Sequence, residues 1–288
     1  MIRSVHFENF RCLKDVELQL QPLTVLVGSS SSGKTSVLEG MHYRLACEPS
    51  DYWRMDTTLR MSLQWTFEDG KQVRRIFPLS AFDSMSLHGH SVQSLALDIG
   101  ALRNDSLMGR VTMLHPTGEN LASVFASLEP AQREAVVSQL SLLVPSIKAV
   151  SLHQTGPRTH QLRFQDRWQP GLWFTPAQVA ESVMYLMAFL VLPYQKPLPD
   201  VLTLDEPERG LHSRLLRQVV AMLRRMTVGS PGVRPVQVVI ATHSFDLLEH
   251  IPPEDLRLLS RSLEDGSVQV SYPKQHLQEW KSRSIEPL

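Results

Sequence analysis

The chain has 288 residues, of which 42% are hydrophobic, and its 29 Lys and Arg residues balance its 29 Asp and Glu residues. This length and hydrophobic fraction suffice for one large α/β domain or two small ones. The balanced charge excludes a global basic field of the kind that drives sequence-independent nucleic-acid binding, while a local basic patch stays open.

Membrane and secretory signals are absent from the sequence pattern. The N-terminal residues lack the apolar core of a signal peptide, and the longest apolar run, at 183–193, is shorter than the about 18 residues of a membrane span. We therefore expect a buried helix there and no membrane contact. The only cysteines, Cys12 and Cys47, have no metal-type spacing, which favours reduced thiols in a cytoplasmic protein.

Three strands are predicted at the start of the chain. Apolar residues alternate with polar ones over 2–7 and 13–20, and the apolar run Leu23–Val27 is short and β-branched, as in a buried strand. Residues 28–36 follow directly and match the pattern G-x-x-x-x-G-K-[ST]. Helix-compatible residues occupy 36–45, so the strand, loop and helix of a phosphate-binding loop are all present.

The phosphate loop predicts a nucleoside-triphosphate site. Backbone N–H groups of the loop and the helix N-terminus point at phosphates, and the helix dipole favours their negative charge. Lys34 would reach the β and γ phosphates, and the Thr35 hydroxyl would ligate Mg²⁺. The predicted nucleotide-binding residues are Gly28, Ser29, Ser30, Ser31, Ser32, Gly33, Lys34, Thr35 and Ser36.

The middle of the chain is less regular. Strand-like patterns at 59–67 and 73–77 flank Asp69-Gly70, a hairpin turn signal. Residues 79–120 are weakly patterned and suggest a variable insertion. Helices are predicted from about 119–121 and after Pro130, ending before Pro145, and a strand is predicted at 162–164.

The second half alternates helices and buried strands. We predict helices at 177–192 and 215–226 and strands at 201–206 and 236–241. The first of these strands ends in Asp205 and Glu206, and the second leads into Thr242-His243-Ser244.

These strand ends supply the other parts of a hydrolytic site, because in open α/β sheets such groups gather at the carboxyl ends of parallel strands. Asp205 would hold Mg²⁺, and Glu206 would orient or deprotonate the attacking water. His243 would donate to the γ-phosphate. The alternatives are a solvated sheet edge for the two carboxylates and a structural hydrogen bond for the histidine.

Several segments resemble the ABC-type ATPases of the RecF, SMC and OLD-like group. Residues 204–212 (LDEPERGLH) are similar to its DEPE-x-GLH segment, Ala241-Thr242-His243-Ser244 to its switch histidine, and Phe7-Glu8-Asn9-Phe10-Arg11 to its N-terminal NFR segment. Looser similarities lie at 118–121, 145–147 and Asp265-Gly266. By resemblance Asn9 and Arg11 lie near the nucleotide; a surface β-turn is the alternative.

The resemblance implies an α/β fold: an ABC-type P-loop NTPase with a mainly parallel core sheet, an N-terminal antiparallel β subdomain and a helical lobe. It implies a single ABC-type ATPase domain over 1–288. Within it, 1–50 hold the first strands and the phosphate loop, 51–170 the β and variable helical lobe, and 171–288 the signature-like helix and the two motif-bearing strands.

Two segments depart from the family pattern. The loop has Ser30 and Ser31 where the family has Asn-Gly, and so lacks a glycine that tolerates positive φ without cost. The family's Ser-x-Gly signature, which a partner subunit presents to the γ-phosphate, has only the weak candidates 175–178 and 180–182. The signature change puts the efficiency of the composite site in question but not nucleotide binding.

The leading hypothesis is a cytoplasmic Mg²⁺-dependent ATPase, with ATP and Mg²⁺ as cofactors, that works as a homodimer or higher oligomer by an ATP-sandwich switch. By resemblance it serves DNA repair or anti-phage defence, with a separate effector protein such as a nuclease and with nucleic acid as an open partner. The alternatives are an ABC transporter nucleotide-binding subunit and a nucleotide-gated scaffold with little turnover.

Overall fold

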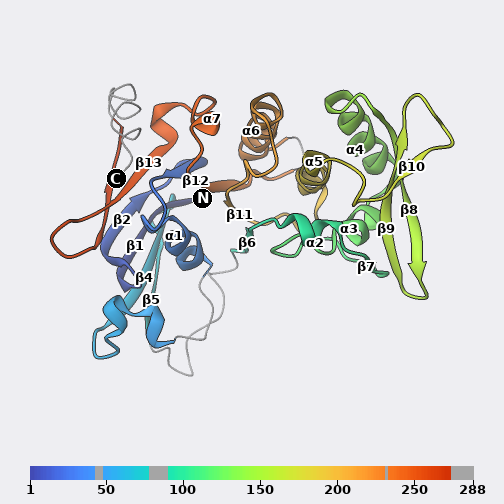
Figure 1. Cartoon of the computed structure of the whole chain (residues 1–288). Helices are drawn as coiled ribbons and strands as arrows, with labels where there is room; N and C mark the ends of the chain where they lie inside the picture. The colour runs from blue at the N-terminus through green and yellow to red at the C-terminus, as the bar shows by residue number, and fades with distance from the viewer. Residues whose placement is uncertain (43–47, 78–89, 231–232, 274–288) are drawn as a thin grey trace. The chain divides into compact units, whose positions relative to one another are not determined.

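The computed structural model describes residues 1–42, 48–77, 90–230 and 233–273. They form two compact units (Figure 1). Unit 1 comprises the described parts of 1–94, 199–206 and 227–288, and unit 2 comprises 95–198 and 207–226. Cys47 and residues 79–89 of the predicted insertion at 79–120 lie outside the described residues. The assignment of 1–288 to a single ABC-type domain stays a prediction.

Unit 1 contains a four-stranded antiparallel sheet of order β2-β1-β4-β5. Its strands are β1 (Ile2–Phe10), β2 (Leu13–Gln19), β4 (Met61–Phe67) and β5 (Gln72–Phe77), with the short 3₁₀ turns η1 (Pro49–Asp51) and η2 (Trp53–Met55) before β4. The apolar residues of β1 are buried as the sequence pattern predicts, with a register shift between Ile2 and Ser4. The hairpin at Asp69-Gly70 is confirmed, since β4 pairs with β5 across it.

A six-stranded sheet of order β14-β13-β3-β12-β11-β6 forms the rest of the core of unit 1. Its strands are β3 (Leu23–Val27), β6 (Val92–Leu95), β11 (Val201–Asp205), β12 (Gln237–Thr242), β13 (Leu256–Arg261) and β14 (Val268–Ser271). β13, β3, β12 and β11 run parallel, and β14 returns antiparallel. Every residue of β3 and β12 is buried, because both faces of a parallel sheet are covered. The mainly parallel core sheet and the antiparallel subdomain are confirmed.

The helices of unit 1 are short. α1 (Lys34–Met41) follows the phosphate loop, α7 (Phe245–Leu248) follows β12, and the 3₁₀ turn η4 (Pro253–Asp255) precedes β13. α1 packs against β1 through Gly40: a Cβ at this position would lie 2.6 Å from Phe7 Cε1 and 3.0 Å from Phe10 Cε1. Both rings are fully buried, so neither has room to move away.

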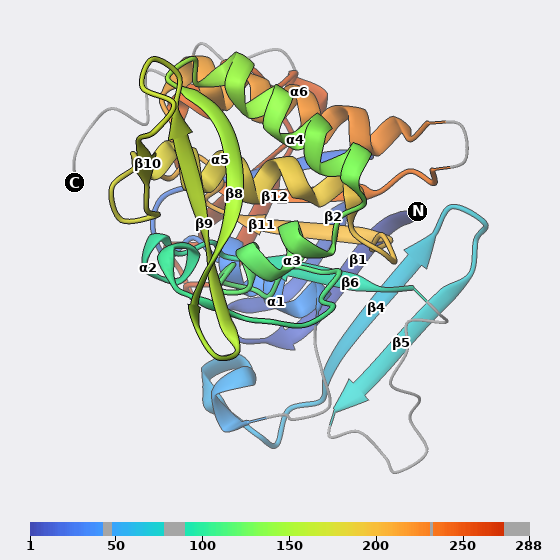
Figure 2. The ribbon, with the colours of Figure 1, turned by 90° about the vertical axis from the view of Figure 1, so that its right-hand side faces the viewer.

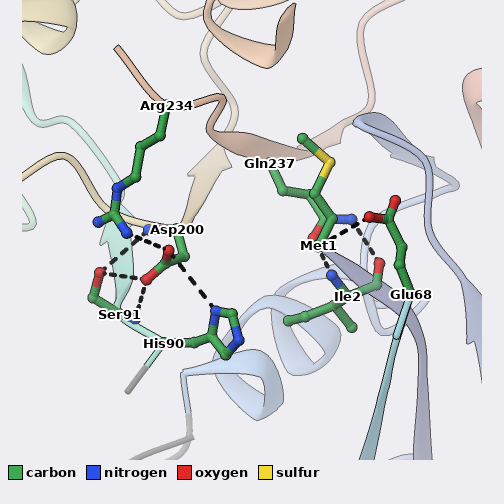
Figure 3. Close-up of polar contacts among 8 residues, drawn as sticks. All are labelled: Met1, Ile2, Glu68, His90, Ser91, Asp200, Arg234 and Gln237. Carbon is green, nitrogen blue, oxygen red and sulfur yellow. Dashed lines mark hydrogen bonds and ion pairs between the residues drawn. The ribbon is translucent and has the colours of Figure 1, made fainter. Parts of the chain in front are cut away.

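A cluster around Asp200 ties β6 to the start of β11 (Figure 3). One carboxylate oxygen of Asp200 accepts hydrogen bonds from Ser91 N at 2.7 Å and Ser91 Oγ at 3.1 Å. The other lies 2.7 Å from Arg234 Nη1 and 3.8 Å from His90 Nδ1. One half-buried carboxylate thus holds two strand starts and the segment that leads to β12.

The chain start is held beside β12 in the same way (Figure 3). Gln237 Oε1 accepts from Ile2 N at 2.9 Å, and Gln237 Nε2 donates to Ile2 O at 2.8 Å. The terminal ammonium of Met1 lies 3.2 Å from Glu68 Oε2. Because the Gln237 side chain is buried, both the oxygen and the nitrogen of its amide need hydrogen-bond partners, and the backbone of β1 supplies them.

Unit 2 combines helices with a second antiparallel sheet, of order β10-β9-β7, in which β8 pairs with β9. Its elements in chain order are α2 (Ile99–Arg103), β7 (Ser106–Leu107), α3 (Leu121–Ser127), α4 (Pro130–Leu143), β8 (Ile147–Gly156), β9 (Thr159–Asp166), β10 (Trp173–Phe174), α5 (Glu181–Val191), η3 (Leu192–Tyr194) and most of α6 (Ser213–Val228). Every residue of α5 from Val183 is buried, as the apolar run predicts. Among the described residues, no helix is long and apolar enough to cross a membrane.

The start of α5 and the strand β8 differ from the sequence-based prediction. The helix predicted at 177–192 begins only at Glu181, because Arg103 donates to the carbonyls of Pro176 and Val179 and holds this segment as a turn. The ten-residue strand β8 was not predicted. Half of its residues are half-buried and four are exposed, without a clean alternation, so the sequence carries no period-2 signal there.

The contact of Gly40 with β1 generates a stability prediction. Gly40→Ala should lower the free energy of unfolding by about 1–3 kcal/mol, because the added methyl group overpacks the two phenylalanine rings more than alanine helps the helix. Urea denaturation measures the change. The matched control is Gly109→Ala, since no atom lies within 4 Å of a Cβ there; equal stability of the two variants would contradict the packing argument.

Candidate nucleotide-binding site

The phosphate loop of unit 1 connects β3 to α1, as predicted. Gly33 caps the helix N-terminus with a left-handed backbone (φ 102°), and Val37 N donates to Gly33 O at 3.0 Å. Lys34 is buried, and its Nζ donates to Gly28 O and Ser29 O, each at 2.8 Å. The ammonium group therefore lies inside the loop, while Ser29, Ser30 and Ser31 are exposed on its outer side.

Glycine is required at both ends of the loop. A Cβ on Gly28 would collide with the Leu259 carbonyl oxygen of β13, and a Cβ on Gly33 would lie 2.6 Å from Val268 Cγ2 of β14. The loop is thus pressed against the β13–β14 hairpin. A side chain at either position would move the loop away from the strand that supports it.

Ser31 carries the strain expected from the serine-rich loop. Its φ is 63°, in the left-handed region where a residue with a Cβ is disfavoured. Arg261 of β13 holds this conformation: its Nε donates to Ser31 O at 2.8 Å and its Nη1 to Gly266 O at 2.6 Å. Arg261 was not singled out from the sequence, because it is separated from Ser31 by 230 positions.

The hairpin that carries Arg261 is itself anchored at Asp265. The Ser267 hydroxyl and the Lys14 ammonium, 2.9 Å from Asp265 Oδ2, hold the pKa of this carboxyl below its usual range. Arg54 Nη2 donates to the Asp265 carbonyl at 3.1 Å. The turn that the sequence places at Asp265-Gly266 therefore supports the phosphate loop through Arg261.

The carboxyl ends of three parallel strands meet beside the loop. Val27 of β3 is in register with Thr242 of β12, and Ala241 of β12 is in register with Asp205 of β11. Thr35 Oγ1 donates to Asp205 Oδ2 at 3.2 Å. The structure thus brings together the two predicted metal ligands, and a hydroxyl with a carboxylate are the hard oxygen donors that suit Mg²⁺.

Glu206 and His243 also lie together. His243 Nδ1 is 2.9 Å from Glu206 Oε1, and the histidine side chain is 56% exposed while the glutamate is 22% exposed. Glu206 has a positive φ of 50°, fixed by its N–H bond to Ala241 O at 2.9 Å. The sequence predicted both residues at strand ends but not their direct contact, which depends on side-chain orientation.

The remaining predicted residues lie in α1 and at the end of β1. Ser36 Oγ is 3.4 Å from Cys12 Sγ. Asn9 and Arg11 flank the end of β1, both with positive φ. Arg11 pairs with Asp51 at 3.0 Å and with Glu39 of α1. The N-terminal segment therefore forms a turn, as in the alternative, and this turn also braces the helix that follows the loop.

The weak signature candidates lie in unit 2. Residues 175–178 form a turn in which Thr175 N donates to Gln178 Oε1 at 2.9 Å, and Ala180 caps the N-terminus of α5. Ser182 is the second residue of this helix. The position before a helix agrees with the sequence-based expectation, although serine and glycine do not occur together there.

Comparison with known families identifies two matching regions. Residues 1–107 match the model described as "AAA ATPase domain", and residues 155–249 match the model "AAA domain, putative AbiEii toxin, Type IV TA system". The first region includes the phosphate loop, and the second includes Asp205, Glu206 and His243.

A curated relative and solved structures agree with these matches. The chain is 32% identical over 91 residues to the OLD nuclease of Thermus scotoductus (strain ATCC 700910 / SA-01), which covers 28% of this chain and 17% of that protein. It shares the fold of an SMC head bound to the C-winged helix domain of ScpA (TM-score 0.60, 13% identity, 97% and 99% coverage). The SMC head domain from Thermotoga maritima is also similar (TM-score 0.55, 10% identity, 95% and 99% coverage).

The hydrogen bond from Arg261 to Ser31 O, which we call the clamp on Ser31, generates a prediction about nucleotide binding. Arg261→Gln should weaken the affinity for a fluorescent ATP analogue about fivefold, because losing a hydrogen bond of about 1 kcal/mol frees a strained loop residue. Adding Ser31→Gly should restore part of the affinity, since glycine adopts positive φ without this cost. Arg3→Gln, an exposed arginine of β1, is the control. Unchanged affinity in Arg261→Gln would show that the loop keeps its shape without the clamp.

Proposed function

We propose that this chain, which belongs to the AAA/ABC-type ATPases of the RecF, SMC and OLD group, uses Mg²⁺-dependent ATP hydrolysis to drive an ATP-sandwich switch between two subunits. The observation that supports it best is the convergence of Thr35, Asp205, Glu206 and His243 at the ends of β3, β11 and β12. We further propose a role in DNA repair or anti-phage defence, with a separate effector protein.

The phosphate loop would bind the triphosphate. Lys34 Nζ already lies among the loop carbonyls, and a phosphate oxygen offers it a stronger, charge-assisted partner than Gly28 O or Ser29 O. The N–H groups of the first turn of α1 add positive partial charge at the same place. The loop thus supplies affinity for the triphosphate rather than for a particular base.

Thr35 and Asp205 would hold Mg²⁺. Their oxygens lie 3.2 Å apart and come from the first turn of α1 and the end of β11. The bound ion would neutralise charge on the β and γ phosphates. The protein's part is to keep both ligands in place, which α1 and β11 do through their backbone hydrogen bonds.

Glu206 would act as the general base. It is largely buried and is positioned by its own backbone bond to β12, so its carboxylate can orient a water molecule and accept its proton. His243 Nδ1 faces Glu206, which leaves Nε2 as the nitrogen that would donate to the γ-phosphate. Loss of the γ-phosphate would then change the hydrogen bonding of both Glu206 and His243.

The second face of the nucleotide would come from another subunit. We assign it to the segment Thr175–Ser182, in which Ala180 is the N-cap of α5 and the first helical N–H groups suit an anion. The similarity to SMC heads supports an assembly that binds partners, since the solved SMC head is bound to a domain of ScpA. The similarity to an OLD nuclease supports a nuclease as effector, although the chain spans only 17% of that relative.

Division of labour between the strand-end residues is testable. Glu206→Gln should bind ATP with wild-type affinity but lower kcat at least about a hundredfold, because the general base is lost. Asp205→Asn should instead raise the Mg²⁺ concentration needed for half-maximal activity. Steady-state phosphate release across a Mg²⁺ titration measures both. Wild-type turnover in Glu206→Gln would show that another residue is the general base. Lys34→Ala, which should not bind ATP, is the negative control.

Nucleotide-linked dimerisation is a separate prediction. A ligand that bridges two subunits shifts their equilibrium by mass action, so Glu206→Gln should form a dimer with Mg-ATP and dissociate with ADP. Light scattering of the apo, ADP and ATP states measures the mass. A monomer in all three states would contradict the ATP-sandwich homodimer, and a mass that does not depend on nucleotide would point to an interface held by other surfaces.

A further inference from the structure

Unit 2 contains a groove of about 760 Å³ between α4 and β8 that the nucleotide chemistry does not use. Figure 2 shows β8 and β9 side by side, and α4 packs against β8. Apolar side chains from both elements line it, among them Val137 and Leu142 of α4 and Val150 and Leu152 of β8. Leu142 is 74% exposed. An isolated exposed leucine is ordinary, but one that continues an apolar groove marks a binding surface.

The groove runs along a strand edge. Val150 and Leu152 face the same side as the buried residues Phe164 and Leu162 of β9, while Ser151, which also lines the groove, faces the other side. Residues from both faces line one groove only where it follows the edge between them. The groove therefore borders the backbone of β8.

That edge offers backbone groups without a strand partner, and next to it the Ser141 hydroxyl of α4 donates to Lys148 O at 3.4 Å. Within the described part of the chain, β8 forms strand pairs only with β9, so the N–H and C=O groups that point away from β9 have no strand partner. The register is regular from Ala149 to Gln154 and shifts only at the two ends. A regular edge of six residues is long enough to accept another strand, and natural proteins usually protect such an edge.

The rim of the groove is basic. Arg133 of α4, Lys148 of β8 and Arg167 after β9 line it, against the single carboxylate of Glu134. Lys148 and Arg167 are exposed, and Arg133 is half-buried. Three cations around an apolar floor are complementary to carboxylates on an otherwise apolar segment.

We propose that an extended, acidic segment of a partner protein binds here by adding a strand to β8. Its backbone would pair with the free edge, its apolar side chains would enter the groove on alternate positions, and its carboxylates would face Arg133, Lys148 and Arg167. The proposal does not rest on the ATPase assignment, because every lining residue belongs to unit 2 and every strand-end residue of the nucleotide site to unit 1.

The lining favours a peptide over the other occupants. Single-stranded nucleic acid is held by exposed aromatic rings on which bases stack, and the only ring that lines this groove, Phe125, is 2% exposed. A second copy paired through β8 would bring the same three cations to both sides of one seam, where like charges oppose association.

Fluorescence anisotropy tests the proposal with a labelled ten-residue peptide of alternating valine and glutamate. We expect binding to the wild-type chain, and at least about tenfold weaker binding of the matched peptide with lysine for glutamate. A peptide with N-methyl groups on alternate backbone nitrogens should also lose binding, since it cannot pair with an edge. Equal binding of the lysine or the N-methyl peptide would overturn the proposal.

Variants of the groove locate the site. Arg133→Glu with Lys148→Glu should weaken the glutamate peptide at least about tenfold, and Leu142→Ser, at an exposed position, several-fold. Arg158→Glu, an exposed arginine at the far end of the β8–β9 hairpin, should bind like wild type, and so should Lys34→Ala, whatever its ATP affinity. Equal loss in Arg158→Glu would overturn the assignment to the groove.

Two further outcomes would overturn the peptide as the ligand of the groove and identify another. Tighter binding of a labelled single-stranded oligonucleotide than of the peptide, lost in the double charge reversal, would overturn the peptide in favour of nucleic acid. A dimer in light scattering that Leu142→Ser dissociates would overturn it in favour of a second copy.

Discussion

The parallel register of β3, β12 and β11 is the constraint on which the candidate site depends. It aligns Val27 with Thr242 and Ala241 with Asp205, so the residues that follow each strand emerge at one edge of the sheet. A slip of one residue would turn Asp205 to the other face and separate it from Thr35. Every residue of β3 and β12 is buried, so both strands are covered on both faces of the sheet.

A second constraint acts on the phosphate loop from the C-terminal hairpin. Leu259 and Val268 leave no room for side chains on Gly28 and Gly33, and Arg261 bonds to the one loop residue with strained φ other than glycine. The loop lacks the family's central glycine, yet its shape is held by a residue more than two hundred positions away. The strain at Ser31 and the clamp on it therefore belong together: serine keeps the left-handed backbone because surrounding contacts determine it.

The sequence predicted the elements whose signals are local and strong. The phosphate loop, the buried strands before Asp205 and His243, and the Asp69-Gly70 hairpin all rest on short patterns with one physical reading. Signals that depend on tertiary contacts were missed. Arg261 resembles any arginine on a strand until β13 is seen beside the loop, and the Glu206–His243 contact depends on two side-chain orientations.

β8 and the start of α5 were missed for a different reason. β8 lies at a sheet edge, where half-buried residues on both faces erase the alternation that marks a strand. The segment before α5 has helix-compatible residues, but the guanidinium of Arg103 binds two of its carbonyls, and the helix begins only at Glu181. Both errors come from contacts between distant residues, which local propensity does not contain.

The chain passes between the two units directly after Glu206, and this position connects the chemistry to the rest of the molecule. Glu206 has a left-handed backbone held by one bond to Ala241, and its carboxylate contacts His243. Pro207, the first residue of unit 2 after this crossing, fixes its own φ and restricts the backbone of Glu206. The Glu206–His243 contact therefore lies where the backbone is constrained on both sides, by the hydrogen bond to Ala241 O and by Pro207.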